Sequence, residues 1–273
     1  MPPQIMAPHD NEIFAVLKVA RRVWAVAAIH GESTRLGSLH AELERRFQAG
    51  DRLVYLGDYL GYGPDIPGTM DELLRFRARL LCHPGTEPWD IAYLRGGQEE
   101  MWHKLLQLQF AKAPAEVFDW MLQQGVGATL QAYGGRAEDI RARFREGVLA
   151  ITKWSGQMRD ALRARPGHEA LLTALRRAAY TEGGELLFAH AGVDPHRPLS
   201  EQSDAFWWGS GYFSAMTERF AGFKMVVSGY DRMHRGARFG AVSCCIDGGC
   251  GFGGSLNAGC FDLEGQRVDW IEA

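Results

Sequence analysis

The chain has few of the features that mark membrane-bound, nucleic-acid-binding or secreted proteins. Its 273 residues carry a formal net charge of only -3 at pH 7, which is too little to suggest a nucleic-acid partner. No apolar run reaches the length of a membrane span. The acidic residues Asp10 and Glu12 interrupt any signal-peptide core near the start. We therefore expect a cytoplasmic protein with no nucleic-acid partner and no membrane span.

Cysteine is scarce and irregularly spaced. The five cysteines are an odd number without the paired spacing of a zinc site: Cys82, Cys244, Cys245, Cys250 and Cys260. Cys244 and Cys245 lie inside an expected strand, so buried, reduced thiols are predicted rather than disulfides. A soft-metal site between Cys244 and Cys250 is the alternative, but this stretch lacks a closed tetrahedral spacing.

Apolar runs and helical patterns alternate along the first part of the chain, whose composition is that of a globular domain. Strands are predicted at residues 23–29, 53–56 and 89–94, with helices after the first two, one capped by Ser33 or Thr34 and one at 65–81. This alternation predicts a mostly parallel sheet with its loops gathered at one edge. Residues 1–20 are expected to form a loose lead-in with a short helix at 12–19.

The later part of the chain predicts a helical cap and a second sheet. Residues 101–180 have a helical pattern and no strand candidate. Further strands are predicted at 185–189, 223–227 and 240–246, before a closing hairpin at 258–262 and 267–271. The predicted fold is α/β: a two-sheet sandwich flanked by helices, with the cap inserted at 101–180. The whole of 1–273 is predicted to be one domain.

Asp58 lies where an open α/β sheet places its ligands, just past the carboxyl end of the predicted strand at 53–56. In that place a carboxylate can bridge two metal ions, an arrangement used for phosphoester hydrolysis. The alternative is that Asp58 only caps a turn. The motifs elsewhere in the chain decide between these interpretations.

Six short motifs follow predicted strands in a fixed order. They are Ala-Ala-Ile-His-Gly at 27–31, Gly-Asp-Tyr-Leu-Gly-Tyr-Gly-Pro at 57–64, Arg-Gly-Gly-Gln-Glu at 95–99, His-Ala-Gly at 190–192, Gly-Tyr-Asp at 229–231 and Asp-Gly-Gly-Cys-Gly-Phe-Gly-Gly at 247–254. Together with the segments 120–134 and 197–208, this order resembles the calcineurin-like metallophosphoesterases. The resemblance is closest to the bacterial serine/threonine protein phosphatase and diadenosine-tetraphosphatase branch, and it covers about residues 23–263.

The resemblance implies a two-metal centre that is only half present here. Ligand types are kept at His30, Asp58 and His190. The other three positions, which are an Asp, an Asn and a His in the family, hold Ala28, Gly97 and Tyr230. Alanine and glycine offer no ligand atom, and a neutral phenol is a poor ligand for a hard cation.

The catalytic residues implied by the resemblance are also depleted. Gln98 takes the place of the general-acid histidine; it cannot titrate, and such an acid typically contributes about 10²–10⁴-fold. Gly61 stands where the family has the carboxylate partner of that histidine. Tyr62 and Gly209 stand where the family has two phosphate-binding arginines. Arg95 survives. We therefore predict no intact catalytic set, with Arg95 and Gln98 as its vestiges.

Several candidate residues keep two interpretations. His30, Asp58 and His190 could hold a single divalent metal such as manganese, or they could be hydrogen-bonded remnants. Asp231 could replace a lost ligand, although its side chain should point away along the strand end. His83, His103 and His234 have no motif support and are interpreted as surface or satisfied histidines. Trp207 and Trp208 are interpreted as core or cap packing, with a ligand platform as the alternative.

These departures predict a degenerate metallophosphoesterase, a pseudophosphatase without a cofactor that has a binding, regulatory or structural role. Its partner would be another protein or a phosphorylated ligand. The alternative is a weakly active metal-dependent phosphoesterase or protein phosphatase with a reduced metal site at His30, Asp58 and His190. A third possibility is a structural subunit whose cap supplies the interface.

Overall fold

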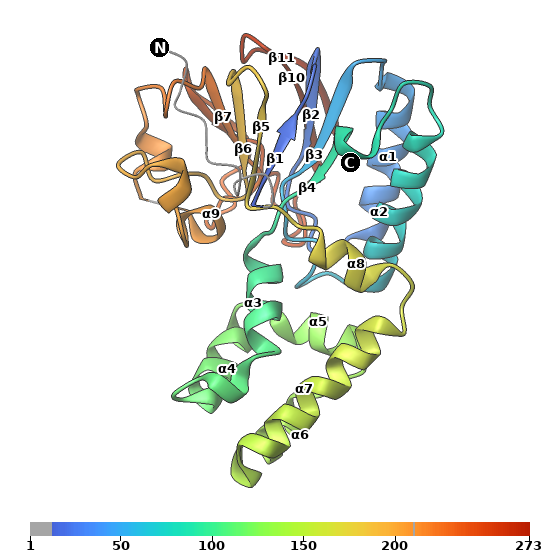
Figure 1. Ribbon diagram of the computed structural model, residues 1–273, viewed down its shortest axis with the longest axis vertical. Coiled ribbons are helices and arrows are strands. Elements are labelled where there is room, and N and C mark those ends of the chain that lie inside the picture. Colours follow the sequence, from blue (N-terminus) through green and yellow to red (C-terminus); the bar gives the residue numbers. More distant parts are fainter. Residues whose placement is uncertain (1–12, 210) are drawn as a thin grey trace.

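Two β-sheets pack face to face in the computed structural model, which describes residues 13–209 and 211–273 (Figure 1). The first sheet has the strand order β1-β5-β6-β7-β9-β8 and the second has the order β11-β10-β2-β3-β4. The strands of the first sheet are β1 (Phe14–Leu17), β5 (Ala178–Thr181), β6 (Leu186–Ala189), β7 (Met225–Ser228), β8 (Arg238–Phe239) and β9 (Ser243–Cys245). Those of the second are β2 (Arg22–Val26), β3 (Asp51–Tyr55), β4 (Ile91–Tyr93), β10 (Asn257–Asp262) and β11 (Arg267–Glu272).

Side chains along β2 alternate between two faces, one packed against the first sheet and one packed against helices. Val23 and Ala25 pack between the sheets, against residues such as Phe188 of β6. Trp24 and Val26 point to the other face of the second sheet, as expected for a strand with a period of two residues. Helices α1 (Ser33–Arg46) and α2 (Ile66–Leu81) cover that face. Strands β2 and β3 are therefore buried on both faces.

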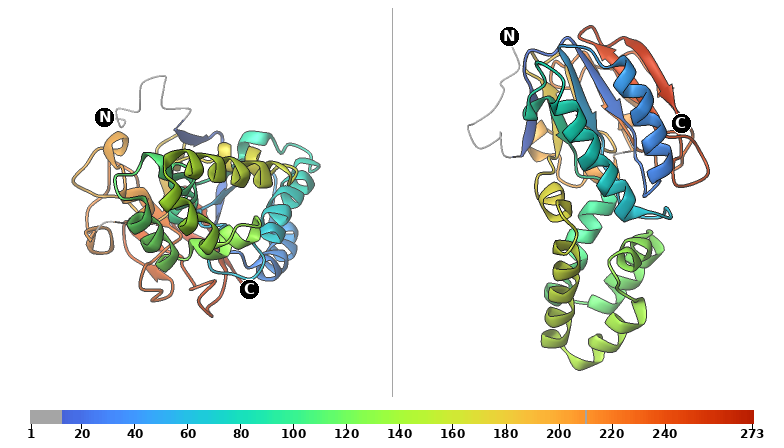
Figure 2. Two further views of the ribbon diagram at one scale, coloured as in Figure 1. Left: turned by 90° about the horizontal axis from the view of Figure 1, so that it is seen from below. Right: turned by 90° about the vertical axis from the view of Figure 1, so that its right-hand side faces the viewer.

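The segment between β4 and β5 is helical and projects from one end of the sandwich (Figure 2). Its helices are α3 (Gly97–Leu105), α4 (Pro114–Gln123), α5 (Val126–Ala132), α6 (Ala137–Glu146), α7 (Val148–Arg163) and α8 (His168–Thr173), with a 3-10 turn at Leu108–Phe110. The remaining short elements are α9 (Ala205–Trp208) and 3-10 turns at Pro88–Asp90, Leu199–Glu201 and Phe213–Ala215. That the whole chain is one domain with this insert as its cap stays a prediction.

The predicted α/β sandwich is confirmed. The wrong predictions concern short strands and the N-cap residue of helix α1. The expected helix at 12–19 is wrong: residues 14–17 form strand β1, which pairs in parallel with β5. Strands β5 and β8 were not predicted. Helix α1 is capped by Glu32 without a side-chain hydrogen bond, and not by Ser33 or Thr34. Residues 1–12 of the expected lead-in lie outside the described residues.

All five cysteines are free thiols, as predicted. Cys82, at the carboxyl end of α2, is exposed and the other four are buried. Burial raises the pKa of Cys250 and of Cys260 to about 12. Among residues 13–209 and 211–273, no helix is both long and apolar enough to cross a bilayer.

A buried polar cluster between α1, α2 and β3 predicts how stability depends on pH. His40 Nδ1 lies 2.7 Å from Glu72 Oε1 and its Nε2 lies 2.8 Å from the Tyr55 hydroxyl. Burial lowers the pKa of His40 below its usual 6.5, so neutral His40 donates from Nδ1 and accepts the Tyr55 proton at Nε2. The hydrogen bond from His40 lowers the pKa of Glu72 below 4.5.

Both pKa changes make acid destabilising, because the unfolded chain binds more protons than the folded one. The contribution of His40 to the free energy of unfolding is expected to fall as the pH drops below 6.5. The contribution of Glu72 is expected to fall as the pH drops below 4.5. Urea unfolding at pH 7.5, 5.5 and 4 should show the fall. A His40→Leu variant should be less stable at pH 7.5 and lose less between pH 7.5 and 5.5. An equal loss in both proteins would contradict this role of His40.

Candidate functional site

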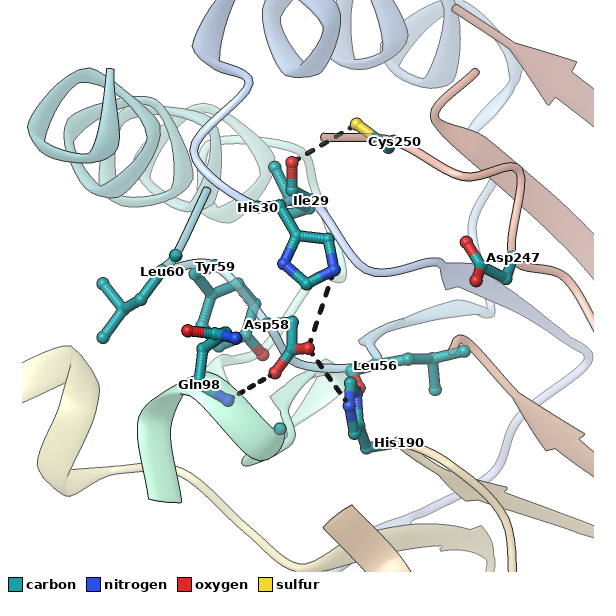
Figure 3. A network of polar contacts seen from close by, with 12 residues as sticks. Ile29, His30, Leu56, Asp58, Tyr59, Leu60, Gln98, His190, Asp247 and Cys250 are labelled. Atoms are coloured by element: carbon teal, nitrogen blue, oxygen red, sulfur yellow. Dashed lines mark hydrogen bonds and ion pairs between the residues drawn. The ribbon is translucent and has the colours of Figure 1, made fainter. Parts of the chain in front are cut away.

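Four loops bring the predicted site residues together at one edge of the sandwich. His30 follows β2, Asp58 follows β3, His190 follows β6 and Tyr230 follows β7. Figure 3 shows His30 and His190 on two sides of the Asp58 carboxylate. These are the carboxyl ends of neighbouring parallel strands, where open α/β sheets bind ligands.

Asp58 is the centre of this cluster. Its Oδ2 lies 3.4 Å from His190 Nε2 and 3.6 Å from His30 Nε2, and its Oδ1 accepts a 2.8 Å hydrogen bond from the backbone N–H of Gln98. His190 Nδ1 lies 2.7 Å from the Leu56 carbonyl oxygen. A carbonyl can only accept, so Nδ1 carries a proton and Nε2 is the atom that faces Asp58. The predicted cluster of His30, Asp58 and His190 therefore exists.

The charges in the cluster are balanced internally. Burial alone would raise the pKa of Asp58, but His190, His30 and the Gln98 amide outweigh it and lower that pKa. Burial alone would lower the pKa of His190, but Asp58 raises it above 6.5. Burial lowers the pKa of His30. The neighbours of Asp58 therefore favour its ionised form, Asp58 favours the protonated form of His190, and burial favours the neutral form of His30.

The backbone at these residues is strained. His30, Asp58 and Tyr62 have φ angles of +52°, +54° and +50°, a left-handed region that non-glycine residues rarely adopt. The carbonyl oxygen of Asp58 accepts from the amides of both Ile29 and His30, at 3.0 and 2.6 Å. Such conformations persist only where their surroundings hold them, and they gather at functional sites. The surrounding structure therefore holds these three residues in place.

Glu99 holds the loops in place, a role that the sequence had not revealed. Its carboxylate accepts four backbone hydrogen bonds, from Asp58 and Gly96 at Oε2 and from Tyr59 and Leu60 at Oε1, all between 2.9 and 3.1 Å. Burial and the nearby Asp58 charge raise the pKa of Glu99 to about 7, against the effect of these amides. Glu99 is the last residue of the motif at 95–99, and this was the only signal in the sequence; we had given Glu99 no role.

The three positions where the resemblance implies further metal ligands hold residues that pack against other parts of the chain. A Cβ atom on Gly97 would lie 2.7 Å from Cζ3 of Trp208, so the indole occupies the space of a side chain at 97. The Tyr230 ring stacks on His190, with centroids 5.0 Å apart and planes 15° apart. Ala28 is buried, and its amide donates to the Gly229 carbonyl oxygen. Protein atoms therefore stand where the resemblance implies metal ligands.

Gln98, at the position where the resemblance implies a general acid, is hydrogen-bonded to the cap. Gln98 Nε2 donates to the carbonyl oxygen of Gln124, which ends α4, over 2.8 Å. The same side chain fills the space beside Gly61, where a Cβ would lie 2.4 Å from Gln98 Cδ. Tyr62 packs in the same way against Gly125. The substitutions at 61, 62 and 98 thus join the cap to the floor of the site.

Aromatic rings close the cluster from solvent. The edges or faces of Tyr62, Tyr230 and Phe252 lie against His30, with ring centroids 5.4, 6.0 and 5.2 Å away. Asp58, His30 and His190 are each at most 2% exposed. The Nε2 atoms of both histidines have no hydrogen-bond partner among the described residues. These rings cover His30, while Asp58 also lines a cavity that cap residues such as Trp120 help to form.

His234 was interpreted as a surface or satisfied histidine, and it belongs to the wall of the site. It stacks on Phe252 with ring centroids 3.9 Å apart, and its Nδ1 lies 3.1 Å from Asp247 Oδ2. Asp231 does not replace a metal ligand in this geometry, because its carboxylate pairs with Arg235 and Arg238.

The other candidates lie apart from the centre. Arg95 pairs with Glu100 at 3.1 Å. His103 lies 2.8 Å from the Gln107 amide, and His83 lies 3.9 Å from Glu44. The thiol of Cys250 donates to the Ile29 carbonyl oxygen.

A cavity of about 200 Å³ remains beside the closed cluster. Its walls come from both the sandwich and the cap: Asp58, Tyr62, Gly97, Gln98, Met101, Trp120, Gln124, Trp207, Trp208, Tyr230 and Arg232. Trp207 and Trp208 were interpreted as packing residues, and they also line this cavity. Aromatic side chains dominate the walls, and one unpaired guanidinium, that of Arg232, adds its charge.

Solved structures with this arrangement of sheets identify the fold. A protein described as a diadenosine tetraphosphatase superposes with a TM-score of 0.57 at 19% identity, covering 96% of this chain and 98% of its own. A cold-active protein tyrosine phosphatase of a psychrophilic Shewanella species gives 0.53 at 11% identity, covering 98% and 85%. A protein serine/threonine phosphatase from Saccharomyces cerevisiae gives 0.50 at 13% identity, covering 96% and 84%.

The chain therefore has the fold of these phosphatase structures. Identities this low show the fold and nothing of the activity. No protein-family model and no curated protein sequence matches the chain.

The two-metal centre expected of this fold does not fit the residues present. Three of the six positions offer no suitable donor, and Trp208 and Tyr230 lie in the space of the missing ones. Within residues 13–209 and 211–273, no group of three or more His, Cys, Asp and Glu side chains is arranged to hold a metal ion. No reaction step is therefore derived through such a centre.

Proposed function

We propose that this chain is a pseudophosphatase: a metallophosphoesterase-fold protein that binds a partner and does not hydrolyse phosphoesters. The observation that carries the proposal is the packing of Trp208 against Gly97. A lost ligand alone would leave a gap, whereas here a large ring has taken its place. The proposal includes a cytoplasmic location and a partner that is another protein or a phosphorylated ligand.

The chemistry around the centre supports the same proposal. Gln98 cannot donate a proton to a leaving group, and its amide is engaged with the cap. Arg95 is paired with Glu100 and does not line the cavity. Arginine clamps on phosphoryl oxygens supply much of the charge stabilisation in phosphoryl transfer, so the loss of acid and clamps together removes both rate and substrate binding at the old centre.

The purified protein is expected to keep no metal after dialysis against manganese and to hydrolyse p-nitrophenyl phosphate no faster than buffer containing manganese. The physical reason is the replacement of three of six ligand positions and of the general acid. Elemental analysis and phosphate release, measured on one sample, check both statements. Asp58→Ala and its control Asp160→Ala, an exposed carboxylate on α7, should then give the same background. Turnover that Asp58→Ala abolishes and Asp160→Ala keeps would refute the proposal.

A single-metal phosphoesterase is the second candidate, because two histidine Nε2 atoms without a hydrogen bond among the described residues lie 3.4 and 3.6 Å from one Asp58 carboxylate oxygen. His30, Asp58 and His190 would hold the metal after moving from their present positions, and one ion would polarise a phosphoryl oxygen without the paired clamp of a two-metal site. In the same elemental analysis, about one manganese per chain that is lost in His30→Gln would favour this candidate over a pseudophosphatase.

A further inference from the structure

The cavity beside the closed cluster has the shape and lining of a binding pocket for one aromatic ring. Tyr62, Trp120, Trp208 and Tyr230 form its walls, and Trp120 and Trp208 meet edge to face with centroids 6.1 Å apart. Its volume of about 200 Å³ is below the ~300–1,000 Å³ typical of drug-sized ligands. It therefore suits a single ring and not a whole nucleotide.

The charge around the cavity favours an anion. The Asp58 carboxylate is already compensated by His190 and by the Gln98 amide. Arg232 lines the cavity, is exposed, and has no hydrogen-bond or ion-pair partner among residues 13–209 and 211–273. An unpaired guanidinium beside an aromatic wall is a ready partner for a phosphate or carboxylate.

A neighbouring hollow reinforces this charge. It has a volume of about 250 Å³ and shares Trp208, Tyr230 and Arg232 with the first cavity. Arg235 and Arg238 line it as well, and both pair with the one carboxylate of Asp231, at 2.9 and 3.0 Å. Three guanidinium groups and one carboxylate leave a net positive charge at the mouth of the aromatic cavity.

We propose that the cavity binds an aryl phosphate, with the ring between Tyr62, Trp120, Trp208 and Tyr230 and the phosphate on Arg232. This rests on the proposed function, because the ligand is held and not hydrolysed. The phosphate lies outside the old metal centre, at the mouth of the cavity. Two of these residues, Tyr62 and Tyr230, stand where the resemblance implies a phosphate-binding arginine and a metal-binding histidine.

Isothermal titration calorimetry with four small probes tests the proposal on the full chain. Phenyl phosphate carries ring and anion, phenol the ring alone, inorganic phosphate the anion alone, and phenyltrimethylammonium the ring with a cation. Phenyl phosphate is expected to bind at least about tenfold more tightly than each of the others, since aromatic and charge-assisted contacts both contribute. Equal binding of inorganic phosphate, tighter binding of phenyltrimethylammonium, or no binding of phenyl phosphate would overturn it.

Variants locate the site. Arg232→Gln is expected to weaken phenyl phosphate binding by about tenfold or more and to leave phenol binding unchanged. Arg145→Gln, at an exposed arginine of α6, removes the same charge and should change nothing. Trp120→Leu, at a half-exposed wall residue, should weaken both phenyl phosphate and phenol. Equal affinities in Arg232→Gln and Arg145→Gln would place the ligand elsewhere and overturn the proposal.

Phosphate release measured in the titration samples separates this inference from the proposed function. Phenyl phosphate that binds and is released unchanged supports both. Phenyl phosphate that binds and is hydrolysed keeps the ligand class and refutes the pseudophosphatase. Neither binding nor hydrolysis refutes the ligand class alone.

Discussion

Replacing Glu99 with alanine is expected to lower the free energy of unfolding by at least about 4 kcal/mol. The variant would leave four buried backbone N–H groups, those of Asp58, Tyr59, Leu60 and Gly96, without an acceptor. Each unsatisfied buried donor costs about 1–3 kcal/mol. A total of this size is a large part of the ~5–15 kcal/mol by which domains are usually stable, so much of the variant should be insoluble or unfolded.

Urea unfolding followed by circular dichroism measures the effect of Glu99→Ala. Glu100→Ala is the matched control on the next residue of α3, because Glu100 pairs with Arg95 and Lys104, whose charged groups reach solvent. That change should cost less than about 1.5 kcal/mol. Similar losses for the two variants would mean that the four amides find other acceptors, and that Glu99 does not hold the loops together.

Restoring asparagine at position 97 is expected to destabilise the protein by about 1–3 kcal/mol and not to rebuild a metal site. The new Cβ would lie 2.7 Å from the Trp208 ring, and overpacking of this kind typically costs that much. Gly156→Asn on α7 is the control, because a Cβ there meets nothing within 4 Å. Its effect should stay within about 0.5 kcal/mol.

A double-mutant cycle with Trp208→Ala isolates this contact. If the indole fills the space of the missing side chain, the double variant should be more stable than the sum of the two single effects predicts, by about 0.5–3 kcal/mol. Thermal and urea unfolding of the four proteins give the coupling. Additive effects would show that Trp208 does not fill the space of a side chain at position 97, and would remove the main support for a site repacked by protein.

Most of the fold could be predicted from sequence because its long elements have strong local signals. Apolar runs that end in glycine turns identified β2, β3 and β6. Strand β1 was missed because its four residues are held by pairing with β5, in a register that joins Phe14 to Ala178. Nothing within such a short segment separates a strand from one turn of helix.

The candidate site, too, could be predicted from sequence only in part. The gathering of His30, Asp58 and His190 followed from their places after parallel strands, and the structure brings them together. The filling of the lost positions could not be predicted, because Trp208 and Gly97 are far apart in sequence and neither residue signals the other. The stacking of His234 on Phe252 depends on tertiary packing in the same way.

The thiols make this protein convenient for site-specific chemistry. Thiolates are the reactive form, and burial keeps Cys244, Cys245, Cys250 and Cys260 protonated. Cys82 alone is exposed, at the end of α2 on the sandwich. One maleimide dye or spin label can therefore be attached to the unmutated chain. A second cysteine engineered into the α6–α7 hairpin would then allow the distance between sandwich and cap to be followed as ligands are added.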